Sequence, residues 1–156
     1  MKSAEFSPDG KWVVAAGDDP TVWVWEASTG KDVAVLRGHA QWVNSVVFSP
    51  DGKWVVTASD DETAGVWEAS TGRGVAVLQG HLGPVKSAVF SPDGKWVVTA
   101  SDDKTAGVWE ASTGKAVAVL RGHMAEVNSA VFSRDGKWVV TASSDYTAQV
   151  WKASME

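Results

Sequence analysis

The residues with the clearest potential for chemistry are three histidines, each followed at the same spacing by a threonine and an aspartate. A histidine, a hydroxyl and a carboxylate are the parts of a nucleophilic triad, in which the histidine activates the hydroxyl. The three sets are His39, Thr57 and Asp61; His81, Thr99 and Asp103; and His123, Thr141 and Asp145. An active site is needed only once and requires an exposed hydroxyl beside an oxyanion pocket. Three near-identical sets therefore favour an architectural role, and we predict no catalytic residue and no enzyme.

Adjacent aspartates are the next candidates, because carboxylate oxygens are the ligands that calcium prefers. They occur as Asp60-Asp61 and Asp102-Asp103. A calcium loop needs several oxygen ligands at close spacing, whereas these pairs lie in segments typical of turns. There is no cysteine to form a disulfide or a thiolate metal site. We therefore predict no metal and no cofactor.

A tryptophan follows every Asp-Gly-Lys segment of the chain. The four residues are Trp12, Trp54, Trp96 and Trp138. Indole rings can stack on sugars or bases, and they also supply large apolar surfaces for packing. Packing between repeated units is the favoured interpretation, and a lectin-like module that binds ligands through these tryptophans is the alternative.

The whole chain is built on an internal repeat of 42 residues. Phe6, Phe48, Phe90 and Phe132 each open the segment F-S-x-D-G-K-W-V-V. The copies that begin at Phe48 and Phe90 differ at only eight of 42 positions. Natural repeats usually diverge further, so this similarity indicates either recent duplication or deliberate construction.

Each repeat contains four short runs that favour β-strands, separated by turn residues. In the second copy the runs are residues 43–48, 54–59, 64–68 and 75–78, and Ser49-Pro50-Asp51-Gly52 has the pattern of a type I turn. Several runs are continuously apolar, so both faces of each sheet must be covered. Because no helical periodicity is present, other sheets must provide that cover, which predicts radially stacked four-stranded sheets. Glycines within the third run, Gly65 and Gly107, indicate a close approach by a backbone or a large side chain.

These repeats resemble those of the WD-repeat family, whose units of about 40 to 45 residues carry Gly-His near the start and Trp-Asp near the end. The closing pair here is Trp67-Glu68, Trp109-Glu110 and Trp151-Lys152, so the acidic partner is replaced or lost. The resemblance covers essentially the whole chain and implies an all-β propeller. We expect one domain, 1–156, of four antiparallel blades, at about 2–38, 43–80, 85–122 and 127–154, the last without its fourth strand.

The resemblance also implies a structural hydrogen-bonded tetrad in each of three blades, which joins a tryptophan to each His-Thr-Asp set. The expected tetrads are His39, Thr57, Asp61 and Trp67; His81, Thr99, Asp103 and Trp109; and His123, Thr141, Asp145 and Trp151. The first repeat retains Asp19 and Trp25, but it has no upstream histidine, and Ala15 stands at the threonine position.

Differences between such similar copies gather between the fourth strand of one repeat and the first strand of the next, and in the turn after the second strand. The resemblance implies that these segments surround a central channel on the narrow face, where partner peptides dock. Aromatic residues and methionine are enriched at binding hot spots. The candidate partner-binding residues are Gln41, Trp42, Lys104, Met124, Glu126 and Tyr146. Neutral drift on exposed loops is the alternative explanation of this variation.

Charge and the chain ends limit the partners. The net charge is −5, with the two signs interspersed, so no basic surface is available for nucleic acid. No apolar run approaches the roughly 20 residues of a membrane span, and the start lacks a signal peptide, which predicts a cytoplasmic protein.

Four blades would fill half of an eight-bladed ring. We therefore expect a non-catalytic scaffold that closes as a two-fold homodimer and also docks peptides or proteins.

Overall fold

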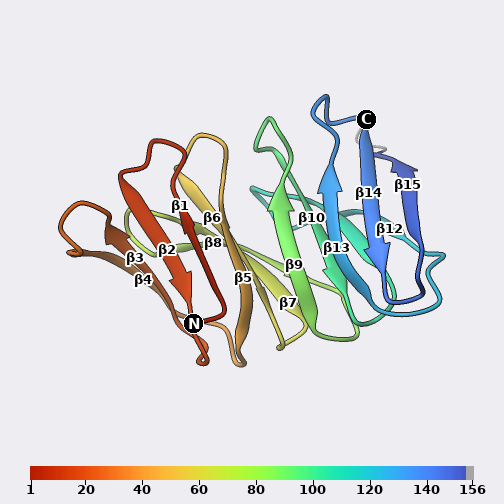
Figure 1. Ribbon diagram of the computed structural model, residues 1–156, viewed down its shortest axis with the longest axis horizontal. Coiled ribbons are helices and arrows are strands. Elements are labelled where there is room, and N and C mark those ends of the chain that lie inside the picture. Colours follow the sequence, from red (N-terminus) through yellow and green to blue (C-terminus); the bar gives the residue numbers. More distant parts are fainter. Residues whose placement is uncertain (154–156) are drawn as a thin grey trace.

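The computed structural model describes residues 1–153, which form four antiparallel β-sheets, here called blades 1 to 4 in chain order (Figure 1). Blade 1 contains β1 (Ser3–Phe6), β2 (Trp12–Ala16), β3 (Val22–Glu26) and β4 (Asp32–Leu36). Blade 2 contains β5 (Val43–Phe48), β6 (Trp54–Ser59), β7 (Thr63–Glu68) and β8 (Gly74–Gln79). Blade 3 contains β9 (Val85–Phe90), β10 (Trp96–Ser101), β11 (Ala106–Glu110) and β12 (Ala116–Leu120). Blade 4 contains β13 (Val127–Phe132), β14 (Trp138–Ser143) and β15 (Ala148–Lys152).

This architecture confirms the predicted all-β fold of four-stranded sheets with a three-stranded fourth sheet. In blade 2 the third and fourth strands each begin one residue earlier than predicted, at Thr63 and Gly74. Ser154, the predicted end of the fourth repeat, lies outside the described residues.

The turn between the first two strands of each blade is determined by local sequence. In blade 2 the Gly52 N–H donates to the Ser49 carbonyl at 2.9 Å, and Gly52 has a φ of 75°, which favours glycine. The Ser49 hydroxyl donates to the Asp51 carboxylate at 2.6 Å and accepts from the Trp54 N–H at 3.0 Å. The same contacts recur in the other blades, so each copy forms the same hairpin.

The blades lie side by side in chain order, and their first strands are neighbours (Figure 1). Contacts between blades are concentrated on β1, β5, β9 and β13, from which the later strands of each sheet extend outward. Sheets that meet along their first strands in this way have the arrangement of propeller blades around an axis.

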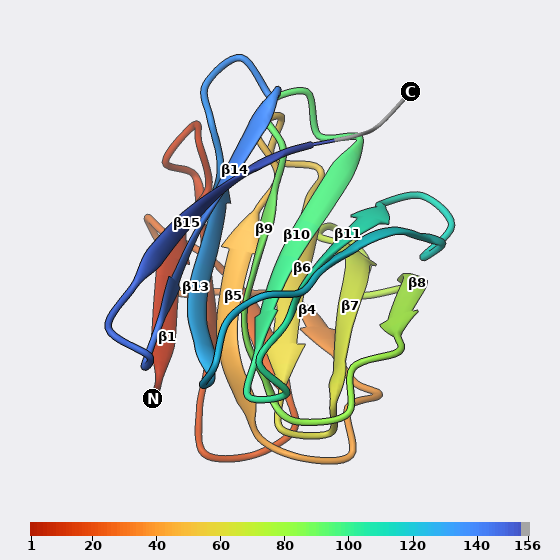
Figure 2. The same cartoon turned by 90° about the vertical axis from the view of Figure 1, so that its right-hand side faces the viewer.

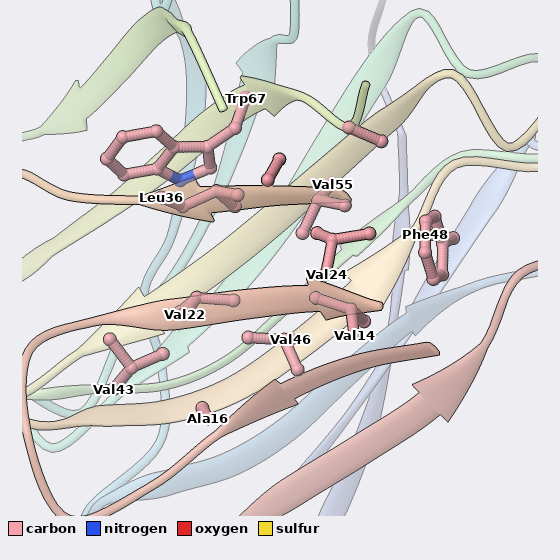
Figure 3. Packing of buried hydrophobic residues seen from close by; sticks show 12 residues of the cluster. Val14, Ala16, Val22, Val24, Leu36, Val43, Val46, Phe48, Val55 and Trp67 are labelled. Carbon is pink, nitrogen blue, oxygen red and sulfur yellow. The ribbon is translucent and has the colours of Figure 1, made fainter. Parts of the chain in front are cut away.

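An apolar core fills each junction between blades. Figure 3 shows the first core, in which Val14 and Leu36 of blade 1 lie with Val46, Phe48 and Val55 of blade 2. Two similar cores lie between blades 2 and 3 and between blades 3 and 4. A sheet in the middle of the array therefore has both faces buried, as its continuous apolar runs predicted.

The outermost faces are more exposed than the inner ones even at positions that carry the same residue. Val56 and Val98 are fully buried, whereas the equivalent Val140 in blade 4 is 40% exposed. Figure 2 shows that β13, β14 and β15 face outward with no sheet in front of them. At the other end, Phe6 of blade 1 is 65% exposed, while its equivalent Phe48 is 5% exposed. Two apolar blade faces thus remain open.

Candidate functional site

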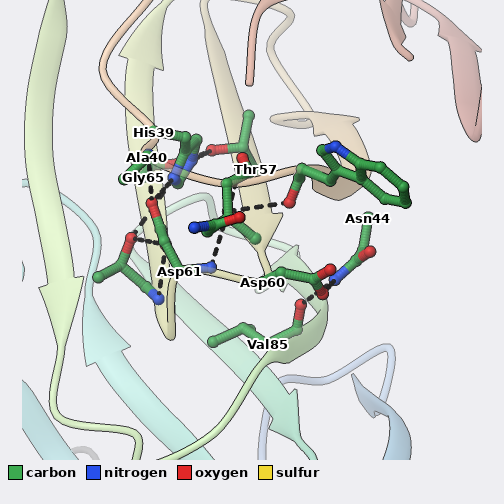
Figure 4. Close-up of polar contacts among 12 residues, drawn as sticks. His39, Ala40, Asn44, Thr57, Asp60, Asp61, Gly65 and Val85 are labelled. Carbon is green, nitrogen blue, oxygen red and sulfur yellow. Dashed lines mark hydrogen bonds and ion pairs between the residues drawn. The ribbon is translucent and has the colours of Figure 1, made fainter. Parts of the chain in front are cut away.

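The tetrad of blade 2 joins the loop after β4, the strands β6 and β7, and the turn between them. Figure 4 shows three of its members, His39, Thr57 and Asp61. His39 Nδ1 lies 2.8 Å from the Asp61 carboxylate, and His39 Nε2 lies 2.6 Å from Thr57 Oγ1. The Trp67 indole N–H donates to the same hydroxyl oxygen at 2.9 Å. Because a carboxylate only accepts, the histidine proton belongs on Nδ1, so Nε2 accepts the threonine hydroxyl. The result is one continuous chain of donors and acceptors.

Blades 3 and 4 repeat this geometry. The imidazole-to-carboxylate distance is 2.8 Å in both His81–Asp103 and His123–Asp145. The imidazole-to-hydroxyl distances are 2.7 Å and 2.6 Å, and the indole-to-hydroxyl distance is 2.9 Å in each blade. The structure therefore brings together all twelve residues that the family resemblance had grouped.

The aspartate of each tetrad also holds the neighbouring loop. Asp103 accepts hydrogen bonds from the Leu82 N–H at 3.1 Å and from the N–H and hydroxyl of Thr105 at 2.9 and 2.6 Å, in addition to His81. Burial opposes ionisation of Asp103, but these hydrogen bonds outweigh it and lower the pKa of the carboxyl to about 2. The pKa values of Asp61 and Asp145 are lowered by equivalent contacts. The charged carboxylate thus ties the loop between blades to the turn after the second strand.

The same geometry is poorly suited to nucleophilic chemistry. Thr57 is fully buried, and its hydroxyl is already engaged by His39 and Trp67, so a substrate would have to displace both contacts. Among residues 1–153 no three or more histidine, aspartate or glutamate side chains are grouped as metal ligands. Nor does the described part of the chain contain a helix with the length and apolarity to cross a membrane.

In blades 2 and 3 a glycine in the third strand makes room for the indole, whereas blade 4 has Gln149 at the equivalent position. A Cβ at Gly65 would lie 2.7 Å from Trp67 Nε1, and one at Gly107 would lie 2.6 Å from Trp109 Nε1. The large side chain that approaches these glycines therefore belongs to the same strand. Blade 1, which lacks the histidine and threonine, has Trp23 at this position, and its ring stacks on Trp25 at 6.4 Å with an interplanar angle of 6°.

The tetrads position one loop face of the molecule. We define the loop face as the segments between blades together with the turns after each second strand, at the lower edge of Figure 1. The candidate partner-binding residues lie there with exposed side chains, including Trp42 at 48%, Met124 at 80% and Tyr146 at 101%. Gln41, Lys104 and Glu126 are exposed as well.

Two features of the loop face were missed from the sequence. Leu82 is 86% exposed and occupies the position equivalent to Met124, so the alignment of copies carried the signal for it. Lys2 Nζ lies 4.5 Å from the centre of the Trp42 ring, which covers part of that candidate anchor with a cation–π contact.

The most variable turn position has an unusual backbone. Glu62, Lys104 and Tyr146 occupy equivalent positions with φ values of 73°, 74° and 68°, in the left-handed region that non-glycine residues rarely adopt. Three different exposed side chains are thus presented from one fixed backbone conformation.

Comparison with known proteins identifies the repeats. The family described as WD domain, G-beta repeat, matches residues 2–26, 30–68, 72–110 and 114–152, which is most of the chain. Among curated proteins, a Notchless protein homolog of Arabidopsis thaliana is 53% identical over 34 residues, 22% of this chain and 7% of that protein. Two uncharacterized WD repeat-containing proteins of Nostoc sp. are 44% identical over 45 residues and 48% identical over 40 residues. These matches cover 29% and 26% of this chain but only 4% and 3% of the two Nostoc proteins, so the chain spans a small part of its relatives. The four matched repeats and the four-sheet fold together show that the chain belongs to the WD-repeat family.

Proposed function

We propose that this chain is a non-catalytic β-propeller scaffold that associates with a second copy of itself through its open blade faces and binds a protein or peptide on its loop face. The coarser part of this proposal rests on the family, whose repeats build protein-interaction scaffolds. The proposed self-association rests on one observation: residues that are buried between inner blades are exposed on the outermost blades.

The exposed face of blade 4 is a copy of a surface that already binds a blade. Val66 and Val108 are 2% and 1% exposed because the next blade covers them, whereas the equivalent Val150 is 69% exposed. Trp138, which corresponds to the half-buried Trp54 and Trp96, is 47% exposed. A blade that packs against blade 4 in the same way would remove this apolar surface from water, which is favourable.

The exposed face of blade 1 corresponds to the face with which an inner blade packs against the preceding blade. Its Phe6 is equivalent to Phe48, which packs against the preceding blade and is 5% exposed. Blade 1 of one copy can therefore follow blade 4 of another as blades 2 and 3 follow their predecessors. Two copies related by a two-fold axis would form both junctions at once, and eight blades would complete a ring.

The loop face is the second part of the proposal. Trp42, Leu82, Met124 and Tyr146 are exposed apolar or aromatic side chains on segments held by the tetrads. Because the tetrad aspartates hold the backbone of the segments between blades, little backbone entropy is lost there on binding. We infer that these side chains provide the contact surface for a peptide or protein.

Light scattering after size-exclusion chromatography tests self-association. The chain at micromolar concentration is expected to elute with the mass of two copies. Val150→Lys is expected to shift it toward the mass of one copy, because it places a charge in the proposed junction. Val119→Lys is the matched control, since Val119 is 50% exposed on β12 and lies outside both open faces.

The outcomes separate the proposal from its alternatives. A one-copy mass for the unmodified chain, or an equal effect of the two substitutions, would contradict association through blade faces. A broad distribution of larger masses would contradict the closed ring and indicate an open polymer.

A further inference from the structure

A cavity of about 370 Å³ lies between blades 2 and 3, at the opposite end of the sheets from the loop face. Its apolar lining includes the indoles of Trp54 and Trp96 together with Phe90. Three polar residues, Lys95, Glu110 and Ser112, also line the cavity. A mostly apolar wall with a few polar groups, within a volume of a few hundred Å³, is typical of small-molecule sites.

The polar groups of this cavity retain hydrogen-bonding capacity. Glu110 accepts from the Thr113 hydroxyl through Oε2 at 2.9 Å, and no other side-chain partner is found for it within residues 1–153. The equivalent Glu68 of blade 2 is more fully engaged. Its Oε2 accepts from Thr71 at 3.2 Å and is paired with Arg73 at 3.5 Å, and its Oε1 accepts from Ser70 at 3.5 Å. Blade 3 has Lys115 in place of Arg73. Blade 3 thus leaves one carboxylate oxygen available beside the two indoles.

The charges at the cavity restrict the ligand class. A cation would be attracted by Glu110 but repelled by Lys95, and an anion would meet the reverse. A neutral ligand with hydroxyl groups can accept from Lys95 and donate to Glu110. The indoles require that the same ligand also present an apolar face. Nucleobases attached to a phosphate backbone are disfavoured by the net charge of −5.

We propose that this cavity binds a pyranose ring of a neutral saccharide, with the ring face against Trp54 and Trp96 and its hydroxyl groups at Lys95, Glu110 and Ser112. This function goes beyond the protein scaffold and does not depend on self-association. The recurring tryptophans also pack between blades, since Trp54 borders the core between blades 2 and 3. Packing and ligand binding are compatible, because each half-buried indole also lines the cavity.

The adjacent junction provides an internal comparison. The cavity between blades 1 and 2 contains Trp12 and Trp54, but its lining also includes Asp9, Lys11 and the engaged Glu68. Its wall is therefore more charged, and its glutamate is already paired with Arg73. We expect the site between blades 2 and 3 to bind the saccharide in preference to this one.

Calorimetric titration of the full chain with cellohexaose, chitohexaose and mannohexaose, in parallel with tryptophan fluorescence, tests the proposal. At least one hexasaccharide is expected to bind. Glu110→Gln is expected to weaken that binding about tenfold, because a hydrogen bond to a charged acceptor is lost. Glu68→Gln is the matched control and is expected to leave the affinity unchanged. Trp96→Ala removes one of the two indoles on which the sugar would stack and is expected to abolish binding. If this variant does not fold, Glu110→Gln still tests the proposal.

Three results would overturn the saccharide site. The first is that none of the three hexasaccharides binds at about 10 mM. The second is that Glu110→Gln and Glu68→Gln have equal effects, which would place binding elsewhere. The third is that tetramethylammonium or inorganic phosphate binds more tightly than every hexasaccharide, which would show that charge rather than a neutral ring is recognised.

Discussion

Replacement of Asp103 by alanine tests the structural role of the tetrads most directly. The substitution removes the acceptor of four hydrogen bonds, which come from His81, from the Leu82 N–H and from the N–H and hydroxyl of Thr105. It leaves the strands of blade 3 and their apolar core unchanged in composition. Any loss of stability therefore reports on the polar network.

The expected magnitude follows from which donors remain buried. His81 and Thr105 are 7% and 8% exposed, so their donors lose a partner that water replaces poorly. Leu82 is 86% exposed, and its N–H can bond to solvent instead. A buried donor left without a partner costs about 1–3 kcal/mol, and partial hydration of the new space reduces the sum. We expect the free energy of unfolding to fall by about 2–4 kcal/mol.

Urea denaturation followed by far-ultraviolet circular dichroism measures this loss, at one fixed protein concentration because self-association would contribute to stability. Asp102→Ala is the matched control. Asp102 pairs with Lys86 at 3.4 Å, and the two side chains are 29% and 39% exposed, so its removal is expected to cost no more than about 1 kcal/mol. An Asp103→Ala variant no less stable than the Asp102→Ala control would falsify the buried-tetrad reasoning.

Two further predictions concern the same network. Because the pKa of Asp103 is lowered from 3.8 to about 2 in the folded chain, its stabilisation is complete above about pH 4 and disappears as the pH falls through about 2. Unfolding free energies measured between pH 5 and pH 2 should therefore decline less steeply in Asp103→Asn than in the unmodified chain, and equal slopes would contradict this. Gly107→Ala is expected to lower the urea midpoint, since the added Cβ would lie 2.6 Å from Trp109 Nε1. Gln149 holds this position in blade 4, but it lies on the edge strand β15, whereas β11 is paired on both sides and has less room to shift. Gly74→Ala should have little effect, because the equivalent residue of blade 3 is Ala116, and comparable losses in both variants would refute the role assigned to Gly107.

The repeat and its hairpins could be predicted because their signals are local. A type I turn such as Ser49-Pro50-Asp51-Gly52 is specified by a few adjacent residues, and the apolar runs beside it show that both sheet faces must be covered. The 42-residue period then extends one prediction to the whole chain. The tetrad residues came from the family resemblance, since their partners lie up to 28 residues apart, as in His39 and Trp67.

The exposure and the contacts of individual side chains, in contrast, were decided by the tertiary structure. Val56 and Val140 stand in the same local sequence, yet one is fully buried and the other 40% exposed, because burial depends on whether a further sheet lies beside the strand. Lys2 and Lys86 occupy equivalent positions, but Lys2 lies over Trp42 and Lys86 pairs with Asp102.

Which hydrogen-bonding groups remain free in the cavity between blades 2 and 3 likewise depends on three-dimensional contacts. Glu68 and Glu110 are the same residue type at the same point of the repeat, but Glu68 pairs with Arg73, whereas within residues 1–153 no ion pair joins Glu110 to the equivalent Lys115. Local sequence determines the strands and turns because the interactions that form them are short in range. The surfaces, pairings and cavities that distinguish one copy from another arise only where separate blades and side chains meet, and those distances are set by packing.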